Sequence, residues 1–418
     1  MAHAKVVILG GGFAGLNAAK ALGHAKLDVW LIDQTNHHLF QPLLYQVATA
    51  ALSPGDIAVP IREILSHYEN ITVIMGEVAK INKTQNVVIL VGGEEISFDY
   101  LIVALGAKHS YFGHNEWETL APGLKTLGDA LNIRERILIS FEKAERSDSI
   151  SEAKKYLNFV IIGGGPTGVE MAGAIAEIAY ETMLKNFRRI DVTKTKIYLI
   201  EGSSHILPVY PERLSEKAKH YLERMGVQVI TSKRVTNITS EGVVVENSLI
   251  PAHNILWAAG NQASPVLQTL EVPLDRQGRV IVGKDLAIPD HPHIFVIGDA
   301  ACAMDQKGSP LPGLAPVAVQ QGRYVAMLLR KRMAPQERPP FRYFDKGSMA
   351  TIGKTKAIGV FGKIQFSGFI AWLAWCFVHI LYLIGFRNRF SVISHWLFSY
   401  FTSRKGARLI YRSPIEKK

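Results

Sequence analysis

The chain has 418 residues, is 48% hydrophobic and 20% charged, and carries a formal net charge of +11 at pH 7. This length leaves room for two to three domains, since about 100–200 residues per domain is usual. The positive charge fits binding to acidic membranes or to nucleic acid. No nucleic-acid motif occurs, however, and the basic residues cluster beside apolar and aromatic residues, so we expect no nucleic-acid partner. No signal peptide precedes the first predicted strand, and we therefore expect the protein to face the cytosol.

That first strand runs into a glycine-rich loop, Gly10-Gly11-Gly12-Phe13-Ala14-Gly15, which an alanine-rich helical stretch follows. The loop fits GxGxxG, in which Gly10 makes the tight turn, Gly12 admits a pyrophosphate and Gly15 lets helix and strand pack closely. The next predicted strand ends in Asp33, 23 residues after Gly10 and close to the ~20 expected of a ribose ligand. A glycine turn alone is common in proteins that bind no nucleotide, but an acid at this spacing favours a dinucleotide site.

A second loop of the same kind, with Gly163, Gly165 and Gly168 at the three positions, predicts a second dinucleotide site. Its following strand ends in Glu201, 38 residues after Gly163 and well beyond the usual ~20, so an insertion at about 181–195 must account for the difference. Glu201 would accept hydrogen bonds from both ribose hydroxyls and repel a 2′-phosphate. The sequence therefore predicts NADH rather than NADPH at this site.

Three further segments each place small or acidic residues at the end of a predicted strand. Residues 100–106 and 254–260 repeat the duplication, since each strand ends where the chain would pass near a dinucleotide. Residues 293–300 read as a buried strand that delivers an acid to a turn, where the acid is also consistent with a helix cap. The residues that mark these strand ends are Ala104, Gly106, Gly260, Gly298 and Asp299.

The chain has only two cysteines, Cys302 and Cys376, far apart and without CxxC or CxxxxC spacing. Flavoproteins that pass electrons through a disulfide need a cysteine pair beside the flavin. We expect two ordinary thiols here and a direct transfer of electrons to the acceptor. No cluster of metal-ligating residues is evident, so we expect no metal.

The carboxyl end is apolar and then basic. Residues 364–386 contain no Asp, Glu, Lys or Arg, a length that can cross a bilayer as a helix. Residues 387–418 carry eight Lys or Arg against one acid, Glu416, which favours anionic lipid. Three interpretations remain: a membrane-surface anchor, which we favour, a transmembrane helix, and a dimerisation or core helix. In the surface anchor, Trp396 and Tyr400 would lie near the headgroups, on a helix with one apolar face: Phe390, Ile393, Leu397 and Phe401.

With these residues in view, the chain resembles the two-dinucleotide-fold flavoproteins of the disulfide-reductase superfamily, and within it the type II NADH dehydrogenases, single-chain NADH:quinone oxidoreductases. The resemblance implies FAD on the first loop, with Asp33 on its ribose and Gly298-Asp299 near its ribityl chain and pyrophosphate. It implies NADH on the second loop with Glu201. The stretch 38–49 looks like the family's flavin-side segment, in which Pro42, Leu43 and Gln46 would line the isoalloxazine.

The resemblance also implies an α/β fold class: two Rossmann-like dinucleotide-binding domains of the glutathione-reductase-like kind, plus a C-terminal membrane-anchoring helical tail. The first nucleotide fold should be interrupted by the second and resumed later. We expect a discontinuous FAD domain at 1–112 and 285–330, an NADH domain at 113–284 and the anchoring region at 331–418.

Three residues are candidates for catalysis through this resemblance. Glu170, just after the second loop, matches a residue that the family assigns to proton delivery or quinone positioning; the alternative is a solvated carboxylate that favours the helix dipole. Gln320 keeps the second glutamine of a family AQxxxQ motif near the quinone, and Gln321 adds a neighbour. Pro316 replaces the first glutamine, which puts a two-glutamine clamp in doubt; the alternative is that both amides cap backbone.

The expected function is hydride transfer from NADH to FAD, then two electrons to a membrane quinone, ubiquinone or menaquinone, without proton pumping. We expect a homodimer held as a peripheral, monotopic protein at the cytoplasmic face of the inner membrane. Two alternatives remain open: a soluble FAD-dependent NADH reductase of another acceptor, and an NADH-sensing flavoprotein resembling apoptosis-inducing factor.

Overall fold

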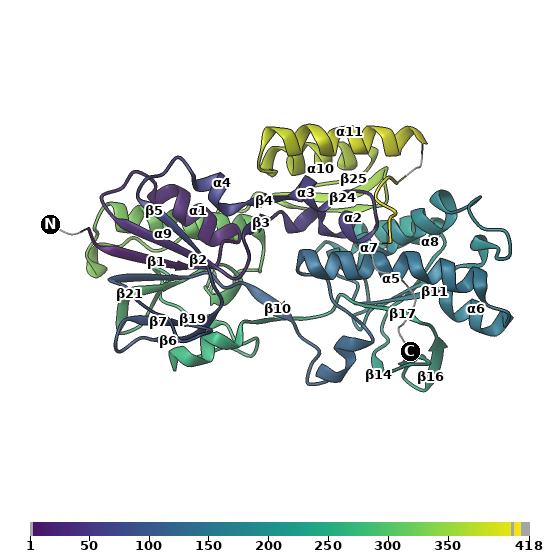
Figure 1. Cartoon of the computed structure of the whole chain (residues 1–418), viewed down its shortest axis with the longest axis horizontal. Coiled ribbons are helices and arrows are strands. Elements are labelled where there is room, and N and C mark those ends of the chain that lie inside the picture. Colours follow the sequence, from purple (N-terminus) through teal and green to yellow (C-terminus); the bar gives the residue numbers. More distant parts are fainter. Residues whose placement is uncertain (1–2, 403–404, 411–418) are drawn as a thin grey trace. The chain divides into compact units, whose positions relative to one another are not determined.

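The structure, a computed structural model, describes residues 3–402 and 405–410. It divides the chain into two compact units, and each is assembled from segments that lie far apart in the sequence (Figure 1). Unit 1 is formed by Met1–Leu39, Ala58–Lys108 and Asn261–Lys346. Unit 2 is formed by Phe40–Ile57, His109–Gly260 and Gly347–Lys418.

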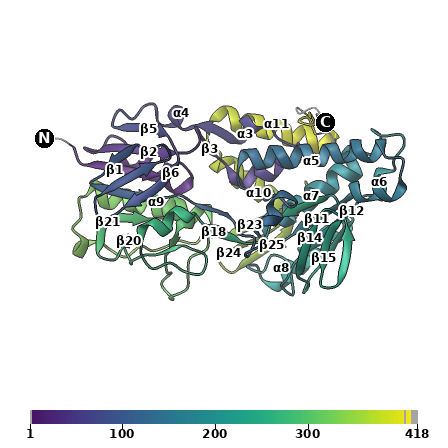
Figure 2. The same ribbon diagram turned by 60° about the horizontal axis from the view of Figure 1, so that its bottom comes forward.

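Unit 1 is built on a six-stranded sheet in the order β20-β21-β9-β1-β2-β5. Every neighbouring pair for which the register is defined is parallel except β20 with β21. Helices α1 (Phe13–Leu22) and α9 (Ala315–Arg330) pack together, with purple β1 and β2 and green α9 in the same part of Figure 2. The strands are β1 (Lys5–Leu9), β2 (Asp28–Asp33), β5 (Ile71–Met75), β9 (Tyr100–Val103), β20 (Ala287–Ile288) and β21 (His291–Val296).

Glycine permits the close packing of these two helices. A Cβ on Gly322 of α9 would lie 2.3 Å from the carbonyl oxygen of Ala14 in α1, so no larger residue fits. The strands beneath are apolar on both faces: Val6, Val7 and Ile8 are fully buried, as expected for parallel strands covered on each side.

The smaller elements of unit 1 include an antiparallel sheet, β6 (Val78–Asn82), β7 (Val87–Leu90) and β8 (Glu95–Ser97), and the 3₁₀ segment η5 (Pro265–Leu270) packs against β6. Leu267 and Leu270 of η5 share a buried cluster with Ile81 and Val88. The other elements of this unit and its margin are β3 (His37–Leu39), β4 (Ala58–Pro60), α4 (Ile61–Leu65), β10 (Ala107–His109), β18 (Asn261–Ala263), β19 (Val280–Ile281), η6 (Gly298–Ala300), β22 (Ala301–Cys302) and η7 (Pro335–Glu337).

These contacts divide the chain differently from the boundaries expected from the sequence. Residues 261–284, expected in the NADH domain, belong to unit 1 because η5 buries its leucines there. Residues 40–57, expected in the FAD domain, belong to unit 2, and unit 1 extends to 346 rather than 330.

Unit 2 repeats the parallel arrangement in a four-stranded sheet with the order β13-β12-β11-β17. Its strands are β11 (Asn158–Ile162), β12 (Lys196–Ile200), β13 (Val227–Ile230) and β17 (Asn254–Trp257). The insertion expected at about 181–195 contains the end of a π-helix, η3 (Ile178–Thr182), and the 3₁₀ turn η4 (Val192–Lys194). Other elements are η2 (Asn115–Thr119), α5 (Leu127–Arg146), α6 (Ile150–Tyr156), α7 (Pro166–Glu177), α8 (Glu212–Arg224), β14 (Val235–Thr239), β15 (Gly242–Val245) and β16 (Ser248–Pro251).

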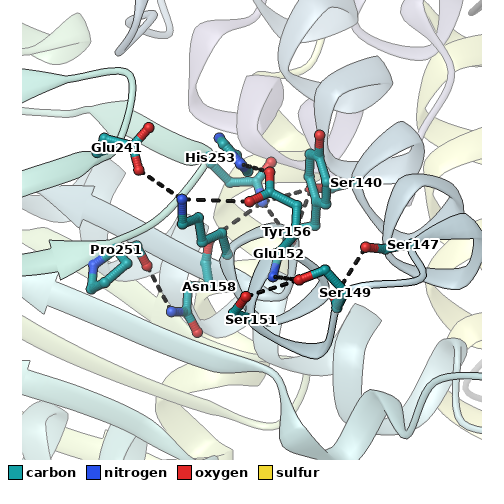
Figure 3. A network of polar contacts seen from close by, with 12 residues as sticks. Ser140, Ser147, Ser149, Ser151, Glu152, Tyr156, Asn158, Glu241, Pro251 and His253 are labelled. Atoms are coloured by element: carbon teal, nitrogen blue, oxygen red, sulfur yellow. Dashed lines mark hydrogen bonds and ion pairs between the residues drawn. The ribbon is translucent and has the colours of Figure 1, made fainter.

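A polar network attaches α6 to this sheet (Figure 3). His253 Nε2 lies 2.7 Å from Glu152 Oε1, and this contact holds the pKa of Glu152 below its usual value. Asn254, buried at the start of β17, donates to Ser140 Oγ at 2.7 Å and to the Tyr156 carbonyl at 2.8 Å. One amide thus joins α5, the end of α6 and the sheet.

The C-terminal part of unit 2 is an antiparallel sheet followed by two helices. The strands are β23 (Ser348–Ile352), β24 (Lys356–Phe361) and β25 (Ile364–Gly368); the helices are α10 (Phe369–Tyr382) and α11 (Phe386–Thr402). Helix α10 packs on β24, and α11 packs on α3 (Pro54–Ile57), which follows η1 (Gln41–Leu43) and α2 (Leu44–Ala48). Both yellow helices lie along one side of this unit in Figure 1.

The interpretation of 364–386 as a transmembrane helix is wrong for the described residues. The first five residues of that stretch form β25, and α10 has 14 residues. Across 3–402 and 405–410, none of the helices combines the length and the apolar character needed to span a bilayer.

Asn254→Ala tests the polar anchor of α6. The substitution leaves Ser140 and the Tyr156 carbonyl without this buried donor, so we expect a loss of about 2 kcal/mol in unfolding free energy. Urea denaturation measures it. Asn115→Ala, at an exposed position on η2, is the matched control and should stay within about 0.5 kcal/mol of the parent. Equal effects of the two substitutions would contradict the assignment.

Candidate functional site

The first glycine loop lies between β1 and α1 in unit 1. Gly10 has a φ of +101°, and a Cβ there would lie 2.4 Å from the Ala104 carbonyl oxygen at the end of β9. A Cβ on Gly15 would lie 1.9 Å from the Gly10 carbonyl oxygen, whereas one on Gly12 would meet nothing within 4 Å. The loop is therefore closed on its protein side and open at Gly12, as a pyrophosphate requires.

Asp33, at the end of β2, is fixed beside this loop. Its Oδ2 accepts from the Gly11 amide at 2.6 Å, and its Oδ1 accepts from the Thr35 amide and hydroxyl at 2.7 and 2.8 Å. These bonds hold the carboxylate where a ribose hydroxyl would meet it.

Unit 2 repeats this geometry at the second loop. Gly163 has a φ of +109°, a Cβ on Gly168 would lie 1.9 Å from the Gly163 carbonyl oxygen, and one on Gly165 would meet nothing within 4 Å. Glu201 Oε2 accepts from the Gly164 amide at 2.6 Å, and Oε1 accepts from the Ser203 amide at 2.7 Å. The duplicated loops thus have matching open positions and matching acids.

The strand ends singled out in the sequence adopt turns that favour glycine. Gly106, Gly260 and Gly298 have φ values of +68°, +73° and +68°. Asp299 lies in η6 beside Gly313, where a Cβ would lie 3.1 Å from Asp299 Oδ1. Ala104, Gly106, Gly298 and Asp299 fall in unit 1 with the first loop, and Gly260 falls in unit 2 with the second.

The amides of Gln320 and Gln321 on α9 are both engaged with backbone. Gln320 donates to the Phe344 carbonyl at 2.9 Å and accepts from the Phe344 amide at 3.0 Å. Gln321 is buried and accepts from the Gly298 amide at 2.6 Å. Both side chains therefore brace the backbone of unit 1.

A cavity of about 60 Å³ in unit 2 brings together two further residues that the sequence singled out. Gln46, on α2, and Glu170, on α7, both line it. Pro42 and Leu43 precede α2 in η1, where Leu43 is fully buried. The cavity has room for a few water molecules.

Glu170 is one of several ionisable residues that line this cavity, with Glu177, Lys354 and Lys405. Desolvation raises its pKa to about 8, against the effect of a hydrogen bond from the Thr351 backbone. The same burial, with Glu170 nearby, raises the pKa of Tyr45 well above its usual value. At neutral pH Glu170 is therefore mostly protonated, in contrast to a solvated helix-start carboxylate.

Tyr45, Trp375 and Trp396 also line this cavity, a position that the sequence did not indicate. Trp396 Nε1 donates to Gln46 Oε1 at 2.7 Å, and Gln46 Nε2 donates to the Tyr45 hydroxyl at 2.8 Å. Trp396 was expected near lipid headgroups, but this hydrogen bond turns it toward α2. Trp375 is buried and, among the described residues, its Nε1 finds no acceptor. Aromatic residues with no periodic signal gave no reason to expect these roles.

Lys405 was expected among the lipid-facing basic residues, and this is wrong. It is buried, donates to the Ala174 carbonyl at 3.1 Å, and lies 3.4 Å from Glu177 Oε2. Burial lowers its pKa. The ion pair holds the segment after α11 against α7. Arg404, Arg412, Glu416, Lys417 and Lys418 lie outside the described residues.

The two cysteines are free thiols in different units. Cys376 lines the cavity, and burial raises its pKa to about 12, so it stays protonated at neutral pH. A protonated thiol is a poor nucleophile.

Comparison with known proteins agrees with this geometry. The pyridine nucleotide-disulphide oxidoreductase family model matches residues 4–322, and the NDH2 C-terminal domain model matches residues 346–405. The protein named type II NADH:quinone oxidoreductase Ndh, from Mycobacterium tuberculosis, is 43% identical over 417 residues, which is 96% of this chain and 89% of that protein. The chain belongs to the type II NADH:quinone oxidoreductase family. A second Mycobacterium tuberculosis relative, type II NADH:quinone oxidoreductase NdhA, is 42% identical over 97% of this chain and 89% of its own length.

Solved structures of other proteins share the fold. NDH2 from Plasmodium falciparum in complex with NADH has a TM-score of 0.88 at 21% identity, covering 96% of this chain and 99% of that one. The sulfide:quinone oxidoreductase of Aquifex aeolicus has a TM-score of 0.74 at 19% identity, covering 96% of both chains. The expected α/β fold with Rossmann-like dinucleotide folds is confirmed.

The residues of this family member fit FAD and NADH as its two dinucleotides. Each loop has a glycine at which an added Cβ would meet nothing within 4 Å: Gly12 in the first and Gly165 in the second. Each loop also has an acid fixed at the end of the following strand: Asp33 in the first and Glu201 in the second. When bound, FAD supplies a hydride acceptor that also passes electrons onward.

Gly165→Ala separates binding from folding at the second glycine loop. A methyl group at Gly165 meets no protein atom within 4 Å, so the fold should be unchanged, but the methyl group occupies the path of the pyrophosphate. We expect NADH to bind at least about 10-fold more weakly, by calorimetry, with an unchanged melting temperature. Gly128→Ala, at an equally uncrowded position in α5, is the control, and unaltered NADH affinity in Gly165→Ala would exclude this loop as the site.

Proposed function

We propose that this enzyme oxidises NADH at unit 2 and reduces a quinone that reaches the Glu170 cavity from a membrane surface. The observation that supports it most strongly is the position of Glu170, whose pKa is raised to about 8 by burial, in a cavity whose wall includes α10 and α11. Relatives across nearly the whole chain are named NADH:quinone oxidoreductases, and this favours quinone over the two alternative functions.

The protein's part in the first half-reaction is to bind and orient NADH. The amides at the start of α7 face the open position at Gly165, where a helix amino end favours phosphate. Glu201, held by Gly164 and Ser203, is positioned to accept from the adenosine ribose hydroxyls. Its negative charge disfavours a 2′-phosphate, which supports NADH as the substrate.

In the second half-reaction the protein supplies one proton donor and one hydrogen-bond donor. Reduction of a quinone to a quinol takes up two protons. Glu170 carries one proton at neutral pH and is suited to protonate a quinone carbonyl oxygen, and the second proton is taken up from water. The buried Trp375 Nε1, without an acceptor among the described residues, is suited to donate a hydrogen bond to a quinone carbonyl oxygen. Because this proton movement is local, we expect no proton pumping.

Helices α10 and α11 support attachment to a membrane surface. On α11 the polar side faces the protein: Ser391 donates to Asp56 at 2.6 Å, and Trp396 donates to Gln46. The apolar side faces outward, with Phe390 67%, Leu397 56% and Phe401 79% exposed. A helix packed only against its own protein would bury its apolar face, whereas one lying in a lipid interface exposes it.

On α10 the same outward side carries Ile370 and Phe377, 75% and 69% exposed. The two helices together form the apolar face, defined here by the exposed side chains of Ile370, Phe377, Phe390, Leu397 and Phe401. Such a patch marks an interaction surface. We place this surface on the cytoplasmic leaflet of the inner membrane, with a homodimer bringing two such faces to one bilayer.

Stopped-flow absorbance tests the function and the role of Glu170 together. The wild-type flavin should bleach rapidly with NADH and reoxidise rapidly with a short-chain quinone. Reoxidation should slow as the pH rises above about 8, because the raised pKa of Glu170 means that the proton is present below that pH and lost above it. Glu170→Gln should slow reoxidation at least about 10-fold, since general acids contribute more than that, remove the pH break and leave bleaching unchanged.

Glu223→Gln, on the exposed side of α8, is the matched control and should behave as wild type. Rapid bleaching with sluggish quinone reoxidation in the wild-type protein would refute the quinone proposal. A wild-type pH profile in Glu170→Gln would refute only the role of Glu170.

Phe390→Ser with Phe401→Ser tests the membrane surface. Each buried Phe side chain contributes about 1.5–3 kcal/mol on transfer from water, so the double variant should bind anionic vesicles at least about 10-fold more weakly by sedimentation. Turnover with a water-soluble quinone should be retained. Ile150→Ser, at a position 76% exposed on α6, controls for the loss of apolar surface, and equal weakening by it would contradict the assignment.

A further inference from the structure

Two neighbouring segments, 201–204 and 231–234, form one edge of the second nucleotide site, which we call the lip. The lip combines one acid with basic side chains. Glu201 ends β12, and Gly202, Ser203 and Ser204 follow it as exposed residues. The segment 231–234, which connects β13 to β14, runs alongside and carries Lys233 and Arg234. Of these residues only Glu201 is negatively charged.

Backbone hydrogen bonds fix the two segments against each other. The Glu201 amide donates to the Ile230 carbonyl at 2.8 Å, and the Lys233 amide donates to the Glu201 carbonyl at 3.2 Å. The Ser232 amide donates to the Ser203 carbonyl at 2.8 Å, with Ser232 at a φ of +57°. The positions of Glu201 and Arg234 at this lip are therefore set by the fold.

The Arg234 side chain lies beside Gly202, the residue that follows Glu201. A Cβ on Gly202 would lie 3.5 Å from Arg234 Cγ and 3.9 Å from Arg234 Nε, an ordinary van der Waals contact. Lys233 is paired with Glu246 at 2.5 Å. Among the described residues, the Arg234 guanidinium has neither a hydrogen-bond acceptor nor an ion-pair partner, so it remains available to a ligand.

An acid at this strand end binds the ribose 2′-hydroxyl, and an arginine nearby accommodates a 2′-phosphate. This lip holds both. The guanidinium presents a planar set of donors that matches a phosphate, but the carboxylate of Glu201 stands at the same ribose and repels the added charge.

We propose that Arg234 is a specificity-determining residue, a latent ligand for a nucleotide 2′-phosphate that the carboxylate of Glu201 masks. The inference rests on the proposed NADH site. It implies that choice between NADH and NADPH depends on a single charge, because the cationic partner is already in place.

Calorimetric titration with 5′-AMP and 2′,5′-ADP tests the inference without use of enzyme activity. Wild-type protein should prefer 5′-AMP. Glu201→Gln and Glu201→Ala, which remove the charge with and without a hydrogen-bonding side chain, should bind 2′,5′-ADP at least about 10-fold more tightly than 5′-AMP. Adding Arg234→Gln to either variant should abolish that preference. Adding Arg224→Gln, at an exposed position on α8, should leave it intact.

Two results would overturn the inference. One is a preference for 2′,5′-ADP that survives Arg234→Gln, and the other is the absence of any such preference in both Glu201 variants. Failure of the wild-type protein to bind 5′-AMP and NADH would instead refute the proposed NADH site, so the two proposals fail by different measurements.

Discussion

The close approach of backbone to backbone at two glycines constrains the whole nucleotide-binding architecture. At Gly15 and at Gly168 a Cβ would lie 1.9 Å from the carbonyl oxygen of the loop's first glycine, so only hydrogen fits between helix and strand. This contact brings the amino ends of α1 and α7 to the phosphate positions. It also places the following strand so that Asp33 or Glu201 bonds back to the loop.

Burial in the cavity of unit 2 raises the pKa of the Glu170 carboxyl to about 8. Glu170 lies only two residues after Gly168. The helix whose start meets the nucleotide phosphate therefore also carries Glu170 to the cavity. Helices α10 and α11 and the Lys405–Glu177 ion pair complete the enclosure. An ion pair buried in this way is weak evidence for stability, but it fixes the segment that follows α11. The nucleotide loop and the cavity thereby share one rigid element, α7.

Helix α11 lines the cavity on one side and exposes apolar side chains on the other. Trp396 and Ser391 use their hydrogen bonds inward, on Gln46 and Asp56, and so orient Phe390 and Phe401 outward. The protein-facing side of α11 combines these hydrogen bonds with the buried Val392 and with ring contacts from Trp396 to Trp375 and from Tyr400 to Trp372. The exposed side of α11 is apolar. Attachment to lipid therefore need not disturb the hydrogen bonds that shape the cavity wall.

The sequence by itself determined the duplicated loops, the acids at the strand ends and the absence of a cysteine pair, because glycine sterics and strand periodicity are local properties. Only the tertiary structure decided the rest. Whether 364–386 forms one helix depends on β25 pairing with β24, and whether Trp396 or Lys405 meets lipid or protein depends on partners hundreds of residues away. The protonation of Glu170 and the placement of Arg234 beside Gly202 likewise arise from surroundings assembled by long-range packing, which no local pattern encodes.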